Sequence, residues 1–311
     1  MSVDAGRGGH IEDGPGTPSA ASGGPDATGT GTGADGTSAD GAGSGPARRG
    51  ARKQRTGGER SSAGDPVRTL ELLWREPGGG SARGPKQRIS LDELVAGAIE
   101  IADAEGLNAL TMRSVAAKLG VTPMATYTYV PGKAELLDLM LDRVYRVMPR
   151  ADLTGKPWRE RVSVIAAANR ALLDAHPWVA YLPTTRPPLG PGVTAKYDHE
   201  LGAFEGLGLD DVTMDAALTH VLGFVNSVAR IAIDTARATA DSGVSDHEWW
   251  ERAAPLLERV LTPERFPLAA RVGSAAGQAH EGAYSAEFAY EFGLARVLDG
   301  LAMLIGDRPR R

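Results

Sequence analysis

Residues Thr111–Lys133 read TMRSVAAKLGVTPMATYTYVPGK, and this stretch decides the fold. Thr111 stands where a helix N-cap is expected, and Gly120 interrupts the apolar pattern that follows it. Thr122 then offers a second N-cap, with Pro123 at the first helical position, where its missing N–H costs nothing. The spacing predicts two short helices joined by a break of about four residues, which is the pattern of a helix-turn-helix.

Helical periodicity continues on both sides of this stretch. Apolar residues at helical spacing predict one helix from Leu91 to Gly106 and a longer one after Gly132. Further helices are predicted at roughly 157–175, 193–205, 213–239, 247–260 and 285–305, with a turn around 178–182 and a loop over 262–284. Alternating β-branched runs are missing, so the sequence predicts an all-α fold. A three-helix helix-turn-helix domain is expected over 89–148 and a larger helical domain over 156–306.

The N-terminal part of the chain has a different composition. Fifteen of the 40 glycines lie in the first fifty residues, and no aromatic residue precedes Trp74. Such a segment buries too little apolar surface to offset the entropy lost on ordering. We therefore expect a disordered low-complexity tail over residues 1–82, containing a basic stretch and a short helix at about 66–76. The absence of cysteine excludes disulfides, thiol catalysis and thiolate metal sites.

The charge distribution indicates a partner. The net charge is −5 overall, but residues 47–88 carry eleven basic residues against four acidic ones. A basic stretch directly ahead of a helix-turn-helix favours nucleic acid, and Arg83 and Lys86 are candidates for a minor-groove arm. Residues 1–20 lack the apolar core of a signal peptide, and no apolar run approaches about 18 residues. We expect a cytoplasmic protein without a membrane partner.

The second helix of the motif carries an unusual number of hydroxyl groups. The polar residues concerned are Thr122, Thr126, Tyr127, Thr128 and Tyr129. Short hydroxyl side chains and phenols suit base edges, thymine methyl groups and phosphates in a major groove. Lys133 follows at the start of the next helix, where an ammonium group can add to the amide donors for a phosphate.

These residues resemble a known family. The stretch LVAGAIEIADAEGLNALTMRSVAAKLGVTPMATYTYVPGKAELLDLML is similar to the DNA-binding domain of TetR/AcrR (tetracycline-repressor-type) transcriptional regulators. RALLDAHPW and FGLARVLDGLAMLI resemble the C-terminal ligand-binding and dimerisation domain of the tetracycline-repressor branch. The resemblance implies a ligand-responsive repressor that binds a near-palindromic operator as a homodimer and is released by a small-molecule effector.

The resemblance also implies roles for individual residues. It assigns DNA contacts to Arg113, Thr122, Met124, Ala125, Tyr127 and Lys133. Tyr129 stands at a position usually held by His, Tyr or Trp, and it either contacts DNA or anchors the helix to the domain core. Thr126 departs from the leucine of most members, which alters the packing of the helix or frees this hydroxyl for a polar contact.

The effector site is less defined by the sequence. Polar candidates are His176, His220, Asn226 and Arg230. A solvated helix face is the better explanation for the last three, and a helix C-terminal cap is the alternative for His176. The six histidines are scattered, so we expect no metal and no cofactor. The G-x-G-x-x-G pattern at Gly31, Gly33 and Gly36 lies in low complexity with no strand before it and no helix after it, and no other catalytic motif is found, which argues against an enzyme. The alternatives are a helical protein-binding adaptor or an activator of the same family.

The last predicted helix is apolar around most of its circumference. One arc contains Tyr290, Leu294, Val297, Leu298, Leu301, Leu304 and Ile305, and a second contains Phe288, Phe292, Ala295 and Ala302. A helix of this kind is buried on more than one side. Its own domain can cover one side, and a second subunit is the economical cover for another. The predicted dimer interface is Gly293, Leu294, Val297, Leu301 and Leu304.

Overall fold

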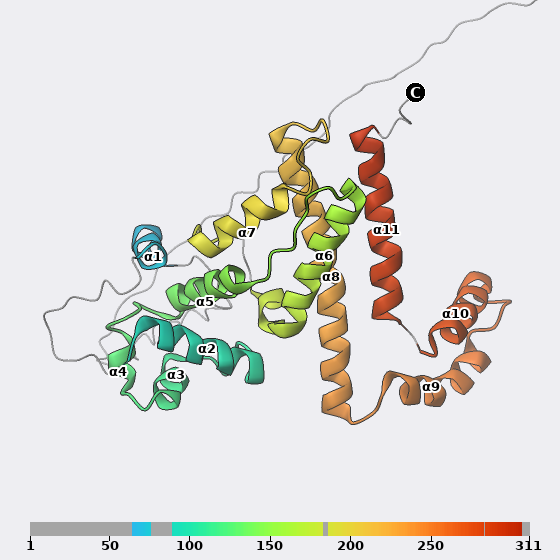
Figure 1. Ribbon diagram of the computed structural model, residues 1–311. Coiled ribbons are helices and arrows are strands. Elements are labelled where there is room, and N and C mark those ends of the chain that lie inside the picture. Colours follow the sequence, from blue (N-terminus) through green and yellow to red (C-terminus); the bar gives the residue numbers. More distant parts are fainter. Residues whose placement is uncertain (1–63, 76–88, 183–185, 283, 307–311) are drawn as a thin grey trace, which may run out of the picture. The chain divides into compact units, whose positions relative to one another are not determined.

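The structure, a computed structural model, describes residues 64–75, 89–182, 186–282 and 284–306 (Figure 1). Eleven α-helices and one 3₁₀ helix form over these residues, without a strand among them, which confirms the predicted all-α fold. Most of the predicted tail lies outside the described residues, as do the two arm candidates Arg83 and Lys86.

The two short helices of the motif begin at the capping residues expected from the sequence, Thr111 and Thr122. The bounds of the N-terminal helices are α1 Pro66–Leu73, α2 Leu91–Glu105, α3 Met112–Lys118, α4 Pro123–Thr126 and α5 Lys133–Val147. Ser90 and Glu93 form a capping box at the start of α2, and Thr111 and Ser114 form one at α3. Gly106, which follows α2, has a positive φ of 79°, a conformation that favours glycine.

The remaining helices form the larger part of the protein. They are α6 Trp158–Ala175, η1 Pro177–Tyr181, α7 Pro191–Leu201, α8 Asp211–Ser242, α9 Asp246–Val260, α10 Pro267–His280 and α11 Ala286–Ile305. By length and hydropathy alone α8 could span a membrane. However, α8 packs against α6 and α11, and Leu218, Val221 and Val225 on its inner face belong to the hydrophobic core. We therefore interpret α8 as a core helix.

The helix α10 corrects the prediction of a loop over 262–284. Its N-cap Phe266 provides no side-chain hydrogen bond, although Pro267 stands at the first helical position, a start signal that the prediction of a loop did not take into account. Gly277 is its only buried residue, and a Cβ there would lie 2.3 Å from the Trp250 ring of α9. The helix thus packs on α9 through a small residue, while Leu268 and Val272, which lie at helical spacing, are exposed.

The connecting helix α5 is fixed to α7 by a buried carboxylate. Asp142 is 2% exposed, and its Oδ1 accepts hydrogen bonds from the backbone N–H groups of Gly192 (2.7 Å) and Val193 (3.0 Å). The carboxylate therefore caps the N-terminus of α7, where the helix dipole favours a negative charge. The two backbones are so close that a Cβ on Gly192 would lie 2.0 Å from the carbonyl oxygen of Asp142.

A second buried polar group lies one helical turn further along α7. Lys196 Nζ donates to Glu200 Oε2 at 2.7 Å, and Asn169 Nδ2 of α6 donates to Glu200 Oε1 at 2.5 Å. The Lys196 ammonium also lies over the Tyr145 ring of α5, 4.9 Å from its centroid. Burial lowers the pKa of Lys196 below its ordinary value, although Glu200 opposes that shift. The cluster joins α5, α6 and α7.

Candidate nucleic-acid interface and junction cavity

The helix-turn-helix has the geometry that its sequence predicts. Gly120 adopts a positive φ of 66° in the turn, and the N–H of Val121 donates to the carbonyl of Ala116 at 3.0 Å. Ala116 is fully buried, so the two helices approach closely at this small residue. Thr122 Oγ1 accepts from the N–H of Ala125 at 3.3 Å and caps α4.

The outward face of α4 combines polar and apolar groups. Met124 is 75% exposed and Tyr127 is 47% exposed, while Thr122 and Thr128 are also exposed. Arg113 is exposed in the first turn of α3 and forms no hydrogen bond or ion pair with any residue that the structure describes. These side chains are therefore available to an external partner.

Thr126 corrects the prediction of a DNA contact at this position. The residue is 0% exposed, and its hydroxyl donates to the carbonyl of Pro123 at 2.7 Å. The hydroxyl is thus satisfied within the helix, where an apolar side chain would otherwise pack. Ala125 is half-buried beside it.

Tyr129 and Lys133 hold the domain together. The Tyr129 hydroxyl donates to the carbonyl of Ile89 at 2.7 Å, next to the start of α2, which supports the anchoring alternative. Lys133 Nζ donates to the carbonyl of Leu107 at 3.1 Å and so fixes the α2–α3 loop to the first turn of α5. The phosphate contact expected of this ammonium stays a prediction.

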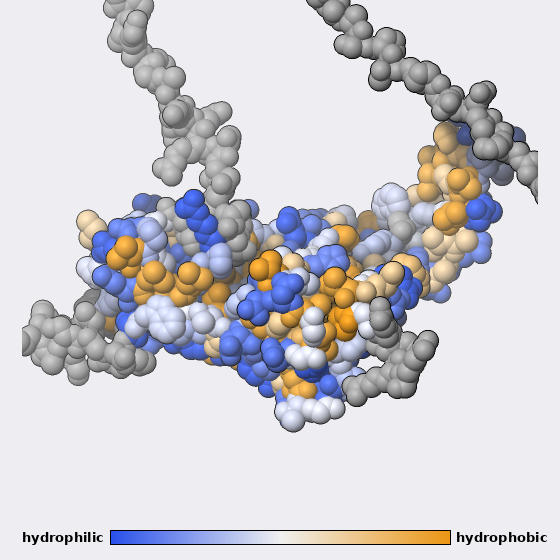
Figure 2. Space-filling model, turned by 90° about the horizontal axis from the view of Figure 1, so that it is seen from above, coloured by the Kyte–Doolittle hydropathy of each residue, from blue (hydrophilic) through white to orange (hydrophobic). Residues whose placement is uncertain are grey.

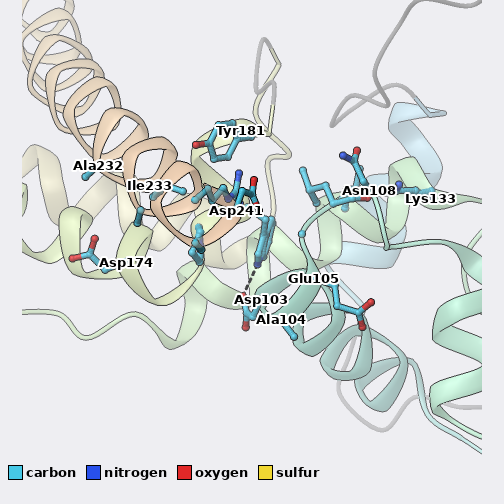
Figure 3. A pocket seen from close by; sticks show the side chains of 18 residues that line it. Asp103, Ala104, Glu105, Asn108, Lys133, Asp174, Tyr181, Ala232, Ile233 and Asp241 are labelled. Carbon is cyan, nitrogen blue, oxygen red and sulfur yellow. Dashed lines mark hydrogen bonds between the residues drawn. The ribbon is translucent and has the colours of Figure 1, made fainter. Parts of the chain in front are cut away.

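A cavity of about 1070 Å³ is lined in part by the same loop. We call it the junction cavity, because its wall combines the end of α2, the α2–α3 loop and the start of α5 with residues of α6, η1 and α8 (Figure 3). Its polar and aromatic lining residues include Asp103, Glu105, Asn108, Lys133, Asp174, Trp178, Tyr181, Arg237 and Asp241.

Two aromatic residues of η1 form hydrogen bonds in the wall of the cavity. Trp178 is buried, and its Nε1 donates to Asp103 Oδ1 at 2.7 Å across the two domains. Tyr181 donates its hydroxyl to Asp234 Oδ1 at 2.5 Å, and the Arg237 guanidinium lies over its ring at 4.8 Å. Partial burial and the hydrogen bond to Asp234 raise the pKa of the Tyr181 hydroxyl above its ordinary value, so it stays a donor.

Comparison with known proteins identifies the family. The model for bacterial regulatory proteins of the tetR family matches residues 94–140, and the model for the tetracyclin repressor-like C-terminal domain matches residues 151–305. The HTH-type transcriptional repressor DrrR1 of Streptomyces coeruleorubidus is 41% identical over 252 residues, which cover 80% of this chain and 90% of the relative. The chain belongs to the TetR family.

Solved structures agree with this assignment. Apo ActR from Streptomyces coelicolor superposes with a TM-score of 0.56 at 26% identity, over 72% of this chain and 99% of ActR. ActR in complex with actinorhodin gives a TM-score of 0.55 at 25% identity, over 69% of this chain and 96% of ActR. The TetR-family chain is thus a DNA-binding transcriptional regulator, and its relatives are regulators and not enzymes.

The predicted effector residues are not gathered at one site in this TetR-family regulator. His176 is the C-cap of α6, and its Nδ1 lies 2.8 Å from Asp103 Oδ1. His220 and Arg230 are exposed on α8, and Asn226 is half-buried. None of the four lines the junction cavity. Sequence reasoning therefore missed the cavity, since it depends on contacts such as Trp178–Asp103 that span 75 residues.

The predicted dimer interface of the regulator is also placed differently. Leu301 is 5% exposed, and Leu294 and Val297 pack against the core of their own chain. A Cβ on Gly293 would lie 2.3 Å from the Phe224 ring of α8, so this small residue serves packing within the chain. Of the predicted set only Leu304 is exposed, at 54%. The arc that was assigned to a partner is the one that α6 and α8 cover.

Proposed function

We propose that this TetR-family regulator is a homodimeric repressor that binds a near-palindromic operator in the cytoplasm and that a small-molecule effector releases it. The observation that carries the proposal is the outward face of α4, where Met124 and Tyr127 are exposed on a helix fixed by its Thr122 cap. The name of the relative DrrR1 supports repression, and the ActR–actinorhodin complex supports an effector.

The side chains on this face suit a major groove. The Thr122 hydroxyl can donate to or accept from a base edge, and the Met124 thioether can contact a thymine methyl group. The Tyr127 phenol suits a backbone phosphate. Two such helices in a symmetric dimer would meet half-sites about 34–36 Å apart, which explains the expected near-palindrome.

The surface that we propose for dimerisation is the second apolar arc of α11, which contains Phe288, Phe292, Ala295 and Ala302. Phe288 and Phe292 are 52% and 53% exposed, their rings stack at 5.9 Å, and Met303 follows at 87%. Apolar side chains are also exposed on the α9–α10 segment, at the right of Figure 2, including Leu256 and Leu268. Apolar surface of this extent is typical of a protein interface, and a second copy would remove it from water.

Release by an effector requires a mechanical link between the domains. The helix α5 belongs to the helix-turn-helix domain and is fixed to α7 through Asp142. A ligand that changes this packing would therefore move α3 and α4. A differential affinity of about 100-fold between the two arrangements would supply about 2.7 kcal/mol of coupling free energy.

Footprinting of the region upstream of the gene tests the proposal. The wild-type chain should protect two half-sites in successive major grooves. The Met124→Glu variant should lose this protection, because it places a carboxylate against the duplex. Thr194→Glu is the matched control, since it adds the same charge on an exposed position of α7. Equal loss of protection in both variants, or one unpaired half-site, would argue against the proposal.

A further inference from the structure

The junction cavity has the dimensions of a ligand site and belongs to both domains. Its volume of about 1070 Å³ lies at the upper end of the range for small-molecule pockets, so it can hold a ligand with several rings. Leu107 and Leu137 line it from the DNA-binding side, and Ala232, Ile233 and Ala236 line it from α8. An apolar body of a ligand would therefore find contacts on both sides.

The charged side chains that line the cavity favour a ligand with a positive charge. Four carboxylates line the cavity, from Asp103, Glu105, Asp174 and Asp241, against two cationic side chains, from Lys133 and Arg237. Glu105 and Asp241 form no hydrogen bond or ion pair with another described residue. Their negative charge is uncompensated within the described part of the chain, and a cationic ligand would compensate it.

The aromatic residues select the shape of the ligand. The guanidinium groups of Arg230 and Arg237 both lie over the Tyr181 ring, 5.0 Å and 4.8 Å from its centroid. The aromatic ring in the wall therefore attracts planar cations, and a ligand cation would take the place of one of these side chains. The hydrogen bond from Trp178 to Asp103 fixes a second aromatic ring at the point where the two domains meet.

We propose that the junction cavity binds the effector and that this effector is a planar aromatic cation. This inference rests on the proposed function, because it names the ligand class of the regulator. A ligand held between the α2–α3 loop and α8 sets the separation of these two elements. Since Lys133 attaches the same loop to α5, the ligand would act directly on the orientation of the helix-turn-helix.

Two dyes with the same ring system provide the test. Rhodamine 123 is a planar xanthene cation, and fluorescein is the corresponding anion. Titration of each dye with the full-length protein, followed by fluorescence anisotropy without DNA, should show binding of the cation and little binding of the anion. Equal binding of both dyes, or binding of neither, would overturn the inference.

A pair of double variants locates the binding. Glu105→Gln/Asp241→Asn removes the two uncompensated carboxylates and should weaken rhodamine binding about tenfold. Asp198→Asn/Glu258→Gln removes the same charge from exposed positions on α7 and α9, and it should bind the dye like wild type. Equal behaviour of the two double variants would place the dye elsewhere and overturn the inference.

A parallel DNA measurement separates the two proposals. If the protein fails to bind the upstream duplex in the absence of dye, the proposed function fails, while the dye titrations still decide whether the cavity binds cations. If DNA binds and rhodamine 123 lowers its affinity in wild type but not in the Glu105/Asp241 double variant, the cavity is an effector site. Cation binding that leaves DNA affinity unchanged would overturn the effector role.

Discussion

The Asp142 carboxylate provides a quantitative test of how the two domains are joined. It is buried, it accepts from two backbone N–H groups of α7, and its Oδ2 accepts from Arg146 Nη2 at 2.9 Å. Hydrogen bonds to a charged group contribute about 1.5–3 kcal/mol each. Replacing Asp142 by alanine removes two such bonds at the start of α7 and leaves buried donors without a partner.

We expect Asp142→Ala to lower the free energy of unfolding by about 3–5 kcal/mol, since breaking a buried charged network costs this much. Arg146→Ala is the matched control. The Arg146 side chain is half exposed, and its removal leaves both backbone donors in place, so the cost should be about 1 kcal/mol. The test compares the losses of unfolding free energy in the two variants, and it depends on their ratio and not on their absolute size.

Urea unfolding followed by circular dichroism measures both variants at one fixed protein concentration, because dimerisation contributes to stability. If Asp142→Ala fails to fold, Asp142→Asn keeps one acceptor oxygen and should lose about 1–2 kcal/mol. An Asp142→Ala variant as stable as Arg146→Ala would refute the reasoning. In that case the hydrogen bonds between Asp142 and the N-terminus of α7 would not be the interaction that fixes α5 to α7.

Three further predictions concern other parts of the chain. In urea unfolding, Lys196→Met should lower the free energy of unfolding by about 3–5 kcal/mol, because Glu200 then stays buried without its cation. The double variant Lys196→Met/Glu200→Leu should recover most of this loss, and equal stability of the two variants would contradict the ion-pair argument. Phe288→Lys/Phe292→Lys should give folded monomers in light scattering, and an unchanged dimer mass would exclude the second arc of α11. Deleting residues 1–46 should leave operator affinity intact, whereas deleting residues 1–63 should weaken it; equal affinities would exclude a role for the basic residues between positions 47 and 63.

The local parts of the fold could be predicted from the sequence. Thr111, Gly120, Thr122 and Pro123 act through their own backbone conformation and hydrogen bonds within a few residues, so they place α3 and α4 without knowledge of the rest of the chain. The helix α10 has Pro267 at its first position but no side-chain cap, because its N-cap is Phe266.

The orientation of individual side chains was harder to predict. A helix of four residues has too few positions for periodicity to fix its inward side, and Thr126 was assigned to the wrong face. In α11 the sequence separated two apolar arcs correctly. It could not determine that the arc containing Leu301 belongs to the protein's own core, since both arcs are apolar.

The cavity depends on contacts between distant segments. Asp103, Trp178 and Arg237 come from three different helices, and no spacing in the sequence relates them. Its charge balance follows from the lining residues only after the helices have packed. A prediction of the effector class therefore needs the three-dimensional arrangement.

The most direct test of the account is the affinity of the full-length protein for its own upstream duplex as a function of salt. Fluorescence anisotropy should give binding that falls by at least about 100-fold between ~50 mM and ~200 mM salt, since several phosphates are neutralised. Tyr127→Ala should bind more weakly throughout this range. No binding to this duplex, or an affinity that is independent of salt, would contradict the claim that α4 presents a DNA-binding surface.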